Sequence, residues 1–196
     1  MEYTGHLGAQ KKEYNDGDSS TQQEETLKEL IKAQMSTAEL SQIKIENVTD
    51  PVAPFRYSFH VRVPGYAQRT GKRIFLQPAF FQTGEKPLFA SSERRYDIYF
   101  HFPWSEEDDV RFSLPEGFVL ENPENPASVG GAGIAQDQII DRISADGKTL
   151  TCERHFFFGG NGVILFPASK YPVVKQLFDL AHETDSHTLT LKQGVK

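Results

Sequence analysis

The sequence predicts a mainly β fold, an antiparallel β-sandwich with an N-terminal connecting helix and a C-terminal helix. Two observations support the sheets. From about residue 40 onward, apolar and polar residues alternate with a period of two, as in strands that have one buried face. Proline and glycine residues gather between these alternating runs, where strands must stop. A third observation supports the helices, because only two stretches place apolar residues three and four positions apart.

The N-terminal segment contains the first of these elements. Residues 3–15 are predicted to form a strand, followed by the turn-rich "NDGDSS". Residues 19–35 are then predicted to form a helix, capped by Ser20 or Thr21. Its apolar face is expected to dock against the rest of the protein, and nothing on it indicates chemistry. That face consists of Leu27, Leu30, Ile31 and Met35.

The remaining elements follow from residue 40. In "PFRYSFHVRV", Phe55, Tyr57 and Phe59 point one way while the intervening polar residues point the other. Asp146-Gly147 predicts a tight hairpin between two later strands, and "FFFGGNGVILF" predicts another hairpin. A second helix is expected in residues 169–187, followed by a strand with two inward leucines. Residues 121–138 are predicted to form a long loop.

The pattern suggests two parts. Residues 1–38 are predicted to be a connecting strand and helix, and residues 39–196 a β-sandwich domain. With 196 residues, of which 38% are hydrophobic, the chain is long enough to bury a core.

Charge and hydropathy exclude several classes of function. The net charge of −6 and pI near 5.5 argue against nucleic acid as the main partner, because phosphate binding depends on clustered Lys and Arg. No apolar run approaches the roughly 20 residues that a membrane-spanning helix needs. The first 20 residues also lack the apolar segment of a signal peptide.

The chain has few candidates for catalytic or metal-binding groups. Cys152 is the single cysteine, so neither an internal disulfide nor a thiolate metal cage can form. Its alternating context favours a buried, inert thiol. The histidines lack the spacing of a helical zinc site. Asp185 is expected to partner His182 or His187 at the end of the second helix, in a capping role. No catalytic residue, metal site or cofactor is therefore predicted.

The stretch "HFPWSEEDD" holds the strongest candidate for a ligand site. Trp104, the only tryptophan, precedes four acids at positions 106–109. Strand alternation would place Glu107 with Asp109 on one side, or Glu106 with Asp108. The simplest interpretation is a strand that ends at the tryptophan, followed by a charged connection. The weaker hypothesis is a ligand or interface site formed by Trp104, Tyr99, Glu107 and Asp109.

Two longer motifs carry a family resemblance. "VPGYAQRTGKRIFLQPAFF" and "KPLFASSERRYDIYFHFPWSEEDDVRFSLPEGF" resemble the C-terminal domain of unknown function of bacterial transglutaminase-like proteins. The closing "YPVVKQLFDLAHETDSHTLTLK" is similar to that family's last helix and strand. The resemblance runs from about Tyr3 to Lys192, and it implies that this module follows a transglutaminase core.

The resemblance implies a non-catalytic accessory module that is structural or positions a substrate. The catalytic Cys, His and Asp would belong to the upstream core, which is this module's expected partner, and the setting would be bacterial, periplasmic or secreted. Cys152 matches no catalytic motif of that family. The alternative is a module that binds glycan or peptide through exposed aromatic residues around Trp104, including Tyr99. A third hypothesis, an isolated hydrolase, would require turnover that depends on Cys152.

Overall fold

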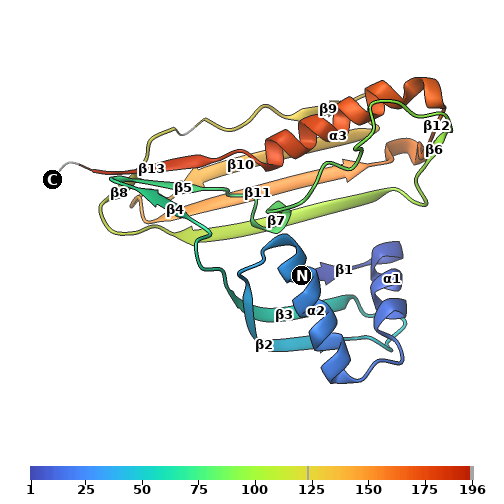
Figure 1. The fold of residues 1–196 in the computed structure, drawn as a ribbon, viewed down its shortest axis with the longest axis horizontal. Helices are drawn as coiled ribbons and strands as arrows, with labels where there is room; N and C mark the ends of the chain where they lie inside the picture. The colour runs from blue at the N-terminus through green and yellow to red at the C-terminus, as the bar shows by residue number, and fades with distance from the viewer. Residues whose placement is uncertain (123, 195–196) are drawn as a thin grey trace. The chain divides into compact units, whose positions relative to one another are not determined.

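The computed structural model describes residues 1–122 and 124–194, which form two compact units, Met1–Tyr66 and Ala67–Lys196 (Figure 1). The sequence predicted a division after residue 38, before the first alternating strands. Contacts instead group those strands with the N-terminal helices. The further idea that the first 38 residues connect to a preceding core stays a prediction.

The N-terminal unit is a three-stranded antiparallel sheet with two helices. The order of its strands is β1-β3-β2. Its centre is formed by the fully buried Leu27 and Phe55, with Tyr57 packed edge-on against the Phe55 ring. Its elements are β1 (Glu2–Tyr3), α1 (Gly5–Asn15), α2 (Ser20–Gln34), β2 (Glu39–Glu46) and β3 (Phe55–Arg62).

The predicted strand at residues 3–15 is wrong, because most of that segment is the helix α1. The helix buries only Gly8 and Asn15, so it lacks the apolar stripe by which sequence analysis recognises a helix. At Gly8 a Cβ atom would lie 2.7 Å from the Tyr3 carbonyl oxygen, so this close approach requires glycine. The helix predicted at residues 19–35 is confirmed as α2, but its cap lies one or two residues before the predicted Ser20 or Thr21. Its N-cap is Ser19, whose side chain and backbone form a capping box with Gln22.

The described residues of the C-terminal unit form three antiparallel sheets and one long helix. The largest sheet has the strand order β7-β11-β10-β9, a second has the order β4-β5-β13-β8, and β12 pairs with β6. Its elements are β4 (Gln68–Thr70), β5 (Arg73–Leu76), η1 (Phe80–Gln82), β6 (Ile98–Tyr99), β7 (Trp104–Ser113), β8 (Phe118–Leu120), β9 (Val129–Gly131), β10 (Ala135–Ile143), β11 (Thr149–Phe158), η2 (Gly160–Gly162), β12 (Leu165–Phe166), η3 (Ala168–Lys170), α3 (Tyr171–Asp185) and β13 (Leu189–Gln193).

One face of the β7-β11-β10-β9 sheet is covered, and we call it the covered face. Figure 1 shows α3 running along this sheet. At one end Phe178 and Ala181 of α3 pack with Phe156 and Phe158 of β11. Further along the strands, Ala79, which follows β5, packs against Ile139 and Cys152. The opposite side, the open face, carries polar and partly exposed residues.

The prediction of a mainly β chain with antiparallel sheets, N-terminal helix and C-terminal helix is confirmed. The hairpin at Asp146-Gly147 is also confirmed: it joins β10 to β11, and Gly147 adopts the left-handed φ of 69° that favours glycine. In β13 the two predicted inward leucines, Leu189 and Leu191, are buried.

Three local predictions are wrong. The acidic run at 106–109 is no connection, because β7 continues through it to Ser113. "FFFGGNGVILF" is no hairpin: β11 pairs with β7 and β10, whereas β12 pairs with β6. The predicted loop at 121–138 contains β9 and the first residues of β10. In the first two cases the pairing partner lies far away in sequence, so local turn signals could not reveal it. In the third, β9 pairs with the adjacent β10 across a short glycine-containing turn, and the glycines of β9 hide the strand pattern.

Candidate functional site

The covered face brings together charged residues from three neighbouring strands. The register places Arg154 of β11 between Asp108 of β7 and Ile139 of β10. In the next row of the ladder, Glu106 of β7 and Asp137 of β10 flank Phe156. Residues two apart on a strand share a face. The pairing alone therefore gathers three carboxylates around one guanidinium.

Arg154 is the centre of this Arg154 cluster, and its side chain is only 4% exposed. Its Nε and Nη2 atoms donate to the two carboxylate oxygens of Asp185, at 2.6 and 3.0 Å, in a bidentate pair. Nη1 donates to Glu106 Oε2 at 2.7 Å and lies 3.7 Å from Asp108 Oδ2. Nε also lies 3.4 Å from Asp137 Oδ1.

The helix α3 is tied to the sheet by this cluster, because Asp185 is its last residue. The bidentate geometry fixes the direction of approach as well as the distance. The main-chain oxygen of Asp185 also accepts a hydrogen bond from the Gln77 side chain at 2.8 Å. The C-terminal end of α3 is therefore held by charged and polar contacts, while its earlier turns are held by apolar packing.

Polar and aromatic neighbours surround the cluster. Gln82 donates from Nε2 to Asp108 Oδ2 at 3.0 Å. Trp104 donates from Nε1 to Glu106 Oε1 at 3.1 Å. The Arg154 guanidinium carbon lies 5.2 Å from the ring centroid of Phe156. Each contact fixes one side of the cluster, so the charged groups have little freedom to rearrange.

Burial dominates the electrostatics of the cluster. Desolvation raises the pKa of Asp108 and of Asp185 above the usual range, even though the hydrogen bonds from Gln82 and Arg154 oppose it. Burial and the negative charge of Asp185 raise the pKa of Asp137 to about 7. Desolvation works to lower the pKa of Arg154, but the hydrogen bonds and charges of Asp185 and the other acids outweigh it and keep that pKa raised.

Cys152 lies one row further along the covered face and is 1% exposed. Burial, followed by the nearby charge of Asp141, raises the pKa of its thiol. The thiolate that a nucleophile requires is thus disfavoured. Asp141 itself is bonded to His187, whose Nε2 lies 2.9 Å from Asp141 Oδ2. Within residues 1–122 and 124–194, no group of three or more His, Cys, Asp or Glu side chains is arranged to hold a metal ion.

The four residues that the sequence predicted as a weak ligand or interface site lie in different surroundings. Trp104 is partly buried on the covered face, and its ring lies 5.0 Å from that of Phe158 and 6.2 Å from that of Phe178. Tyr99 is 58% exposed on β6. Glu107 and Asp109 are exposed together on the open face, opposite to Trp104. The structure therefore brings the two acids together but separates them from the tryptophan.

The expected pairing of Asp185 with a histidine also differs from what is found. The Asp185 carboxylate binds Arg154, while His187 binds Asp141 and the main-chain oxygen of Thr184. Sequence reasoning missed Arg154 entirely. A signal was present, because Arg154 is the one charged residue among Leu150, Cys152, Phe156 and Phe158, which share its side of the strand.

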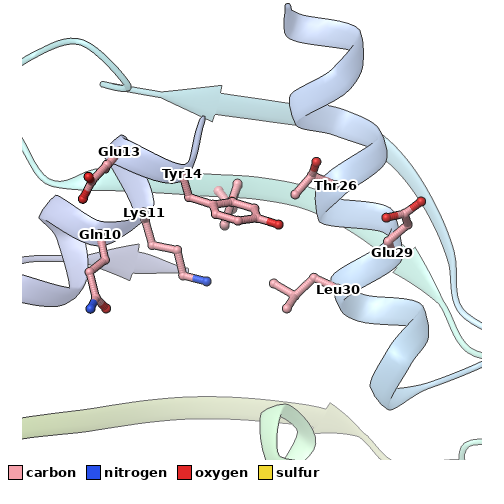
Figure 2. A pocket seen from close by; sticks show the side chains of 8 residues that line it. Gln10, Lys11, Glu13, Tyr14, Thr26, Glu29 and Leu30 are labelled. Carbon is pink, nitrogen blue, oxygen red and sulfur yellow. The ribbon is translucent and has the colours of Figure 1, made fainter. Parts of the chain in front are cut away.

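A separate concavity of about 710 Å³ lies in the N-terminal unit. Figure 2 shows Lys11 and Tyr14 of α1 directed toward Thr26 and Leu30 of α2. Burial lowers the pKa of Lys11, whose ammonium lies 5.2 Å from the Tyr3 ring centroid. The groove is open to solvent. The residues that line it are Gln10, Lys11, Glu13, Tyr14, Thr26, Glu29, Leu30 and Tyr57.

Comparison with known protein families gives a match to most of the C-terminal unit. The profile of the DUF3858 family, described as a domain of unknown function with a solved structure, matches residues 72–191, which is more than half of the chain. The chain belongs to this family. The match contains the whole Arg154 cluster and α3, so the covered face lies within the DUF3858 domain. No curated protein and no solved structure matches the chain. No helix in the described part of the chain is long and apolar enough to cross a membrane.

Proposed function

We propose that this DUF3858 protein is a non-catalytic accessory module of a bacterial transglutaminase-like protein. In that role it supports the catalytic core structurally or positions its substrate. The observation that carries the proposal is the kind of group that the buried, covered face contains. Where an enzyme would place an activated group, the covered face holds Arg154, already paired with Asp185 and Glu106.

The lone thiol supports the same conclusion. A transglutaminase-like hydrolase works through a cysteine that is activated by a neighbouring base. Cys152 is buried among Ala79, Ile139 and Val110, its pKa is raised, and its nearest charged neighbour is an acid. We therefore assign catalysis to an upstream core and a supporting role to this chain. The proposed location is the bacterial periplasm or the cell exterior.

The alternative role as a glycan- or peptide-binding module depends on exposed aromatic residues around Trp104. The geometry does not favour it, because the Trp104 ring packs into an aromatic cluster with Phe100, Phe156, Phe158 and Phe178. Tyr99 remains exposed, but its ring is in contact with His101 rather than with Trp104. A carbohydrate platform needs a flat, accessible ring, which Trp104 does not offer.

The deciding experiment has two parts. First, the upstream reading frame is sequenced, and an in-frame Cys-His-Asp transglutaminase core is expected. Second, the full-length protein and a version lacking residues 67–196 are assayed side by side on a glutamine-containing peptide. We expect the full-length protein to be active, with a changed KM or stability when the module is removed.

The isolated chain supplies the control for this experiment. We expect no turnover of the peptide by this chain and no difference between the natural sequence and Cys152→Ala. Turnover that disappears in Cys152→Ala would overturn the proposal, because it would make this chain the enzyme. An upstream frame without a transglutaminase core would equally rule it out.

A further inference from the structure

The Arg154 cluster contains more negative than positive charge. Four carboxylates, those of Glu106, Asp108, Asp137 and Asp185, lie within 4 Å of the one guanidinium. If all four were ionised, the cluster would keep three uncompensated negative charges. Glu106 is 41% exposed, but Asp108, Asp137 and Asp185 are 18% exposed or less. Like charges held close together in such a buried space cannot all remain ionised without a large cost in free energy.

Asp137 is the member that is least well satisfied. Its side chain is 1% exposed, and neither of its oxygens accepts a hydrogen bond from any residue that the structure describes. The Arg154 Nε atom, which lies 3.4 Å from Asp137 Oδ1, already donates to Asp185. A buried carboxylate without donors is strongly disfavoured, whereas a protonated carboxyl carries its own donor. The neighbouring carboxylate oxygens would accept that hydrogen bond.

We propose that the Arg154 cluster is a proton-binding site, in which the folded protein holds a proton on Asp137 and releases it to solvent as the medium becomes alkaline. In the protonated form, the O–H group donates to an adjacent carboxylate oxygen, and the excess charge of the cluster falls by one. In the deprotonated form, Asp137 competes with Asp185 for the Arg154 Nε atom, which lies 3.4 Å from Asp137 Oδ1.

Three of the elements around Asp137 contribute charged groups that act on it. Strand β7 contributes Glu106 and Asp108, β11 contributes Arg154, and α3 contributes Asp185, which His182 of the same helix also influences. Strand β9, which pairs with Asp137 through Val129, contributes no charge. Glu85, which follows η1, interacts with Glu106, Asp185 and Arg154. The net charge facing Asp137 is negative, which favours the bound proton. Desolvation acts in the same direction and raises the pKa of Asp137 to about 7.

The effect on stability has a defined sign. The folded-state pKa of Asp137 lies above its ordinary value of 3.8, so between those two pH values the folded chain binds a proton that the unfolded chain does not. The stabilisation is complete below the lower value. It is lost as pH rises, and the loss ends near pH 7. Within that window, the unfolding constant should increase by up to about tenfold per pH unit from this group alone.

The site also links pH to the docking of α3. Ionisation of Asp137 places a further anion beside the guanidinium that anchors Asp185, the last residue of the helix. We therefore expect the final turn of α3 to open more often at pH 8 than at pH 5. The first turns, held by Tyr171 and Val174 in the aromatic cluster, should not respond.

The first test is a carboxyl carbon NMR titration of the natural chain, with one variant used to assign the resonance. We expect one buried aspartate to titrate near pH 7, assigned to Asp137 by its loss in Asp137→Asn. A titration of Asp137 near 4 would overturn the proposal. Because this measurement does not involve a catalytic core, its failure would leave the accessory role of the module untouched. A failure of the accessory role would likewise leave the proton-binding site untouched.

Stability measurements provide the second arm. Urea unfolding is followed from pH 5 to 8 for the natural chain, Asp137→Asn and the matched control Asp109→Asn, whose side chain is exposed on the open face. The slope of the free energy of unfolding against pH gives the number of protons released on unfolding. We expect this number to fall by up to one in Asp137→Asn and to stay unchanged in Asp109→Asn. Equal slopes in all three proteins would count against the proposal. Stabilisation by added Ca²⁺ or Mg²⁺ that is lost in Asp137→Asn would replace the proton with a metal ion and would also overturn it.

Discussion

The two faces of strand β7 carry the same kind of residue and have opposite physical roles. Glu106 and Asp108 point to the covered face and bind Arg154, Gln82 and Trp104. Glu107 and Asp109, one position further along in each case, point to the open face and stay in water. The contacts of these two acids are screened by solvent, as in the 2.8 Å hydrogen bond from Arg111 to Asp109.

This comparison shows that environment, rather than composition, decides what a carboxylate does. Four consecutive acids alternate between the two faces, so a one-residue step moves a carboxylate from one environment to the other. The side-chain exposure rises from 18% at Asp108 to 52% at Asp109, although Glu106 at the edge of the cluster keeps 41%. On the covered face, desolvation raises pKa values and makes each ion pair necessary. On the open face, water screens the charges, and pairing contributes little.

The largest effect is expected when the covered face loses its cation. In Arg154→Ala, four carboxylates would remain without their common partner, and we expect a loss of about 4 kcal/mol in the free energy of unfolding at pH 7. The matched variant Arg111→Ala removes an arginine from the open face of the same sheet and should cost less than about 0.5 kcal/mol. Urea unfolding followed by circular dichroism measures both.

The pH dependence of this variant sharpens the comparison. At pH 5 the uncompensated carboxylates can take up protons, so the loss in Arg154→Ala should become smaller, while that in Arg111→Ala should not change. If Arg154→Ala does not fold at pH 7, the two variants can still be compared by urea unfolding at pH 5. A loss in Arg154→Ala no larger than in Arg111→Ala would show that the cluster contributes nothing to stability.

A smaller but still large effect is expected at Trp104, which begins the covered face of β7. Trp104→Ala would remove ring contacts with Phe158 and Phe178 and the hydrogen bond to Glu106. Because the side chain is only partly buried, we expect a loss near the lower end of the usual range, about 3 kcal/mol. Its neighbour Ser105 faces the open side, and Ser105→Ala should change stability by less than about 0.5 kcal/mol.

Thermal and urea unfolding of the two variants test this prediction. A loss below about 1 kcal/mol in Trp104→Ala would mean that the ring is not part of the core. It would then revive the interpretation of Trp104 as a binding residue. Titration with peptides or oligosaccharides would be the measurement to make in that case.

Local periodicity was sufficient to predict most of the fold. The alternation in β3, the hairpin glycine Gly147 and the apolar face of α3 are each determined by residues close together in sequence. These features depend on side-chain period and turn chemistry, which a single sequence displays. The fold class was therefore predictable without any knowledge of the strand order.

The Arg154 cluster was not predictable in the same way. Its members come from β7, β10, β11 and α3, and only the register of the ladder shows that Asp137 and Glu106 flank the same residue. The acidic run at 106–109 was interpreted as a turn because consecutive charges usually mark one. Strand alternation allowed Glu106 and Asp108 to share a face. The cation that makes such a face stable is Arg154, which lies 46 positions after Asp108 in the sequence.

The smallest effect is expected at the open-face pair of Asp109 and Arg111, whose atoms approach as closely as those of several buried contacts. Both side chains are more than half exposed, and the Arg111 Nη2 to Asp109 Oδ2 distance is 2.8 Å. A double-mutant cycle with Asp109→Ala and Arg111→Ala should give a coupling of about 0.5 kcal/mol or less, and that coupling should vanish in 1 M salt. The corresponding cycle between Arg154 and Asp185 should exceed it several-fold and respond weakly to salt. If the two cycles agreed in size, the depth of a charged pair would not control its strength, and the contrast between the two faces of β7 would fail.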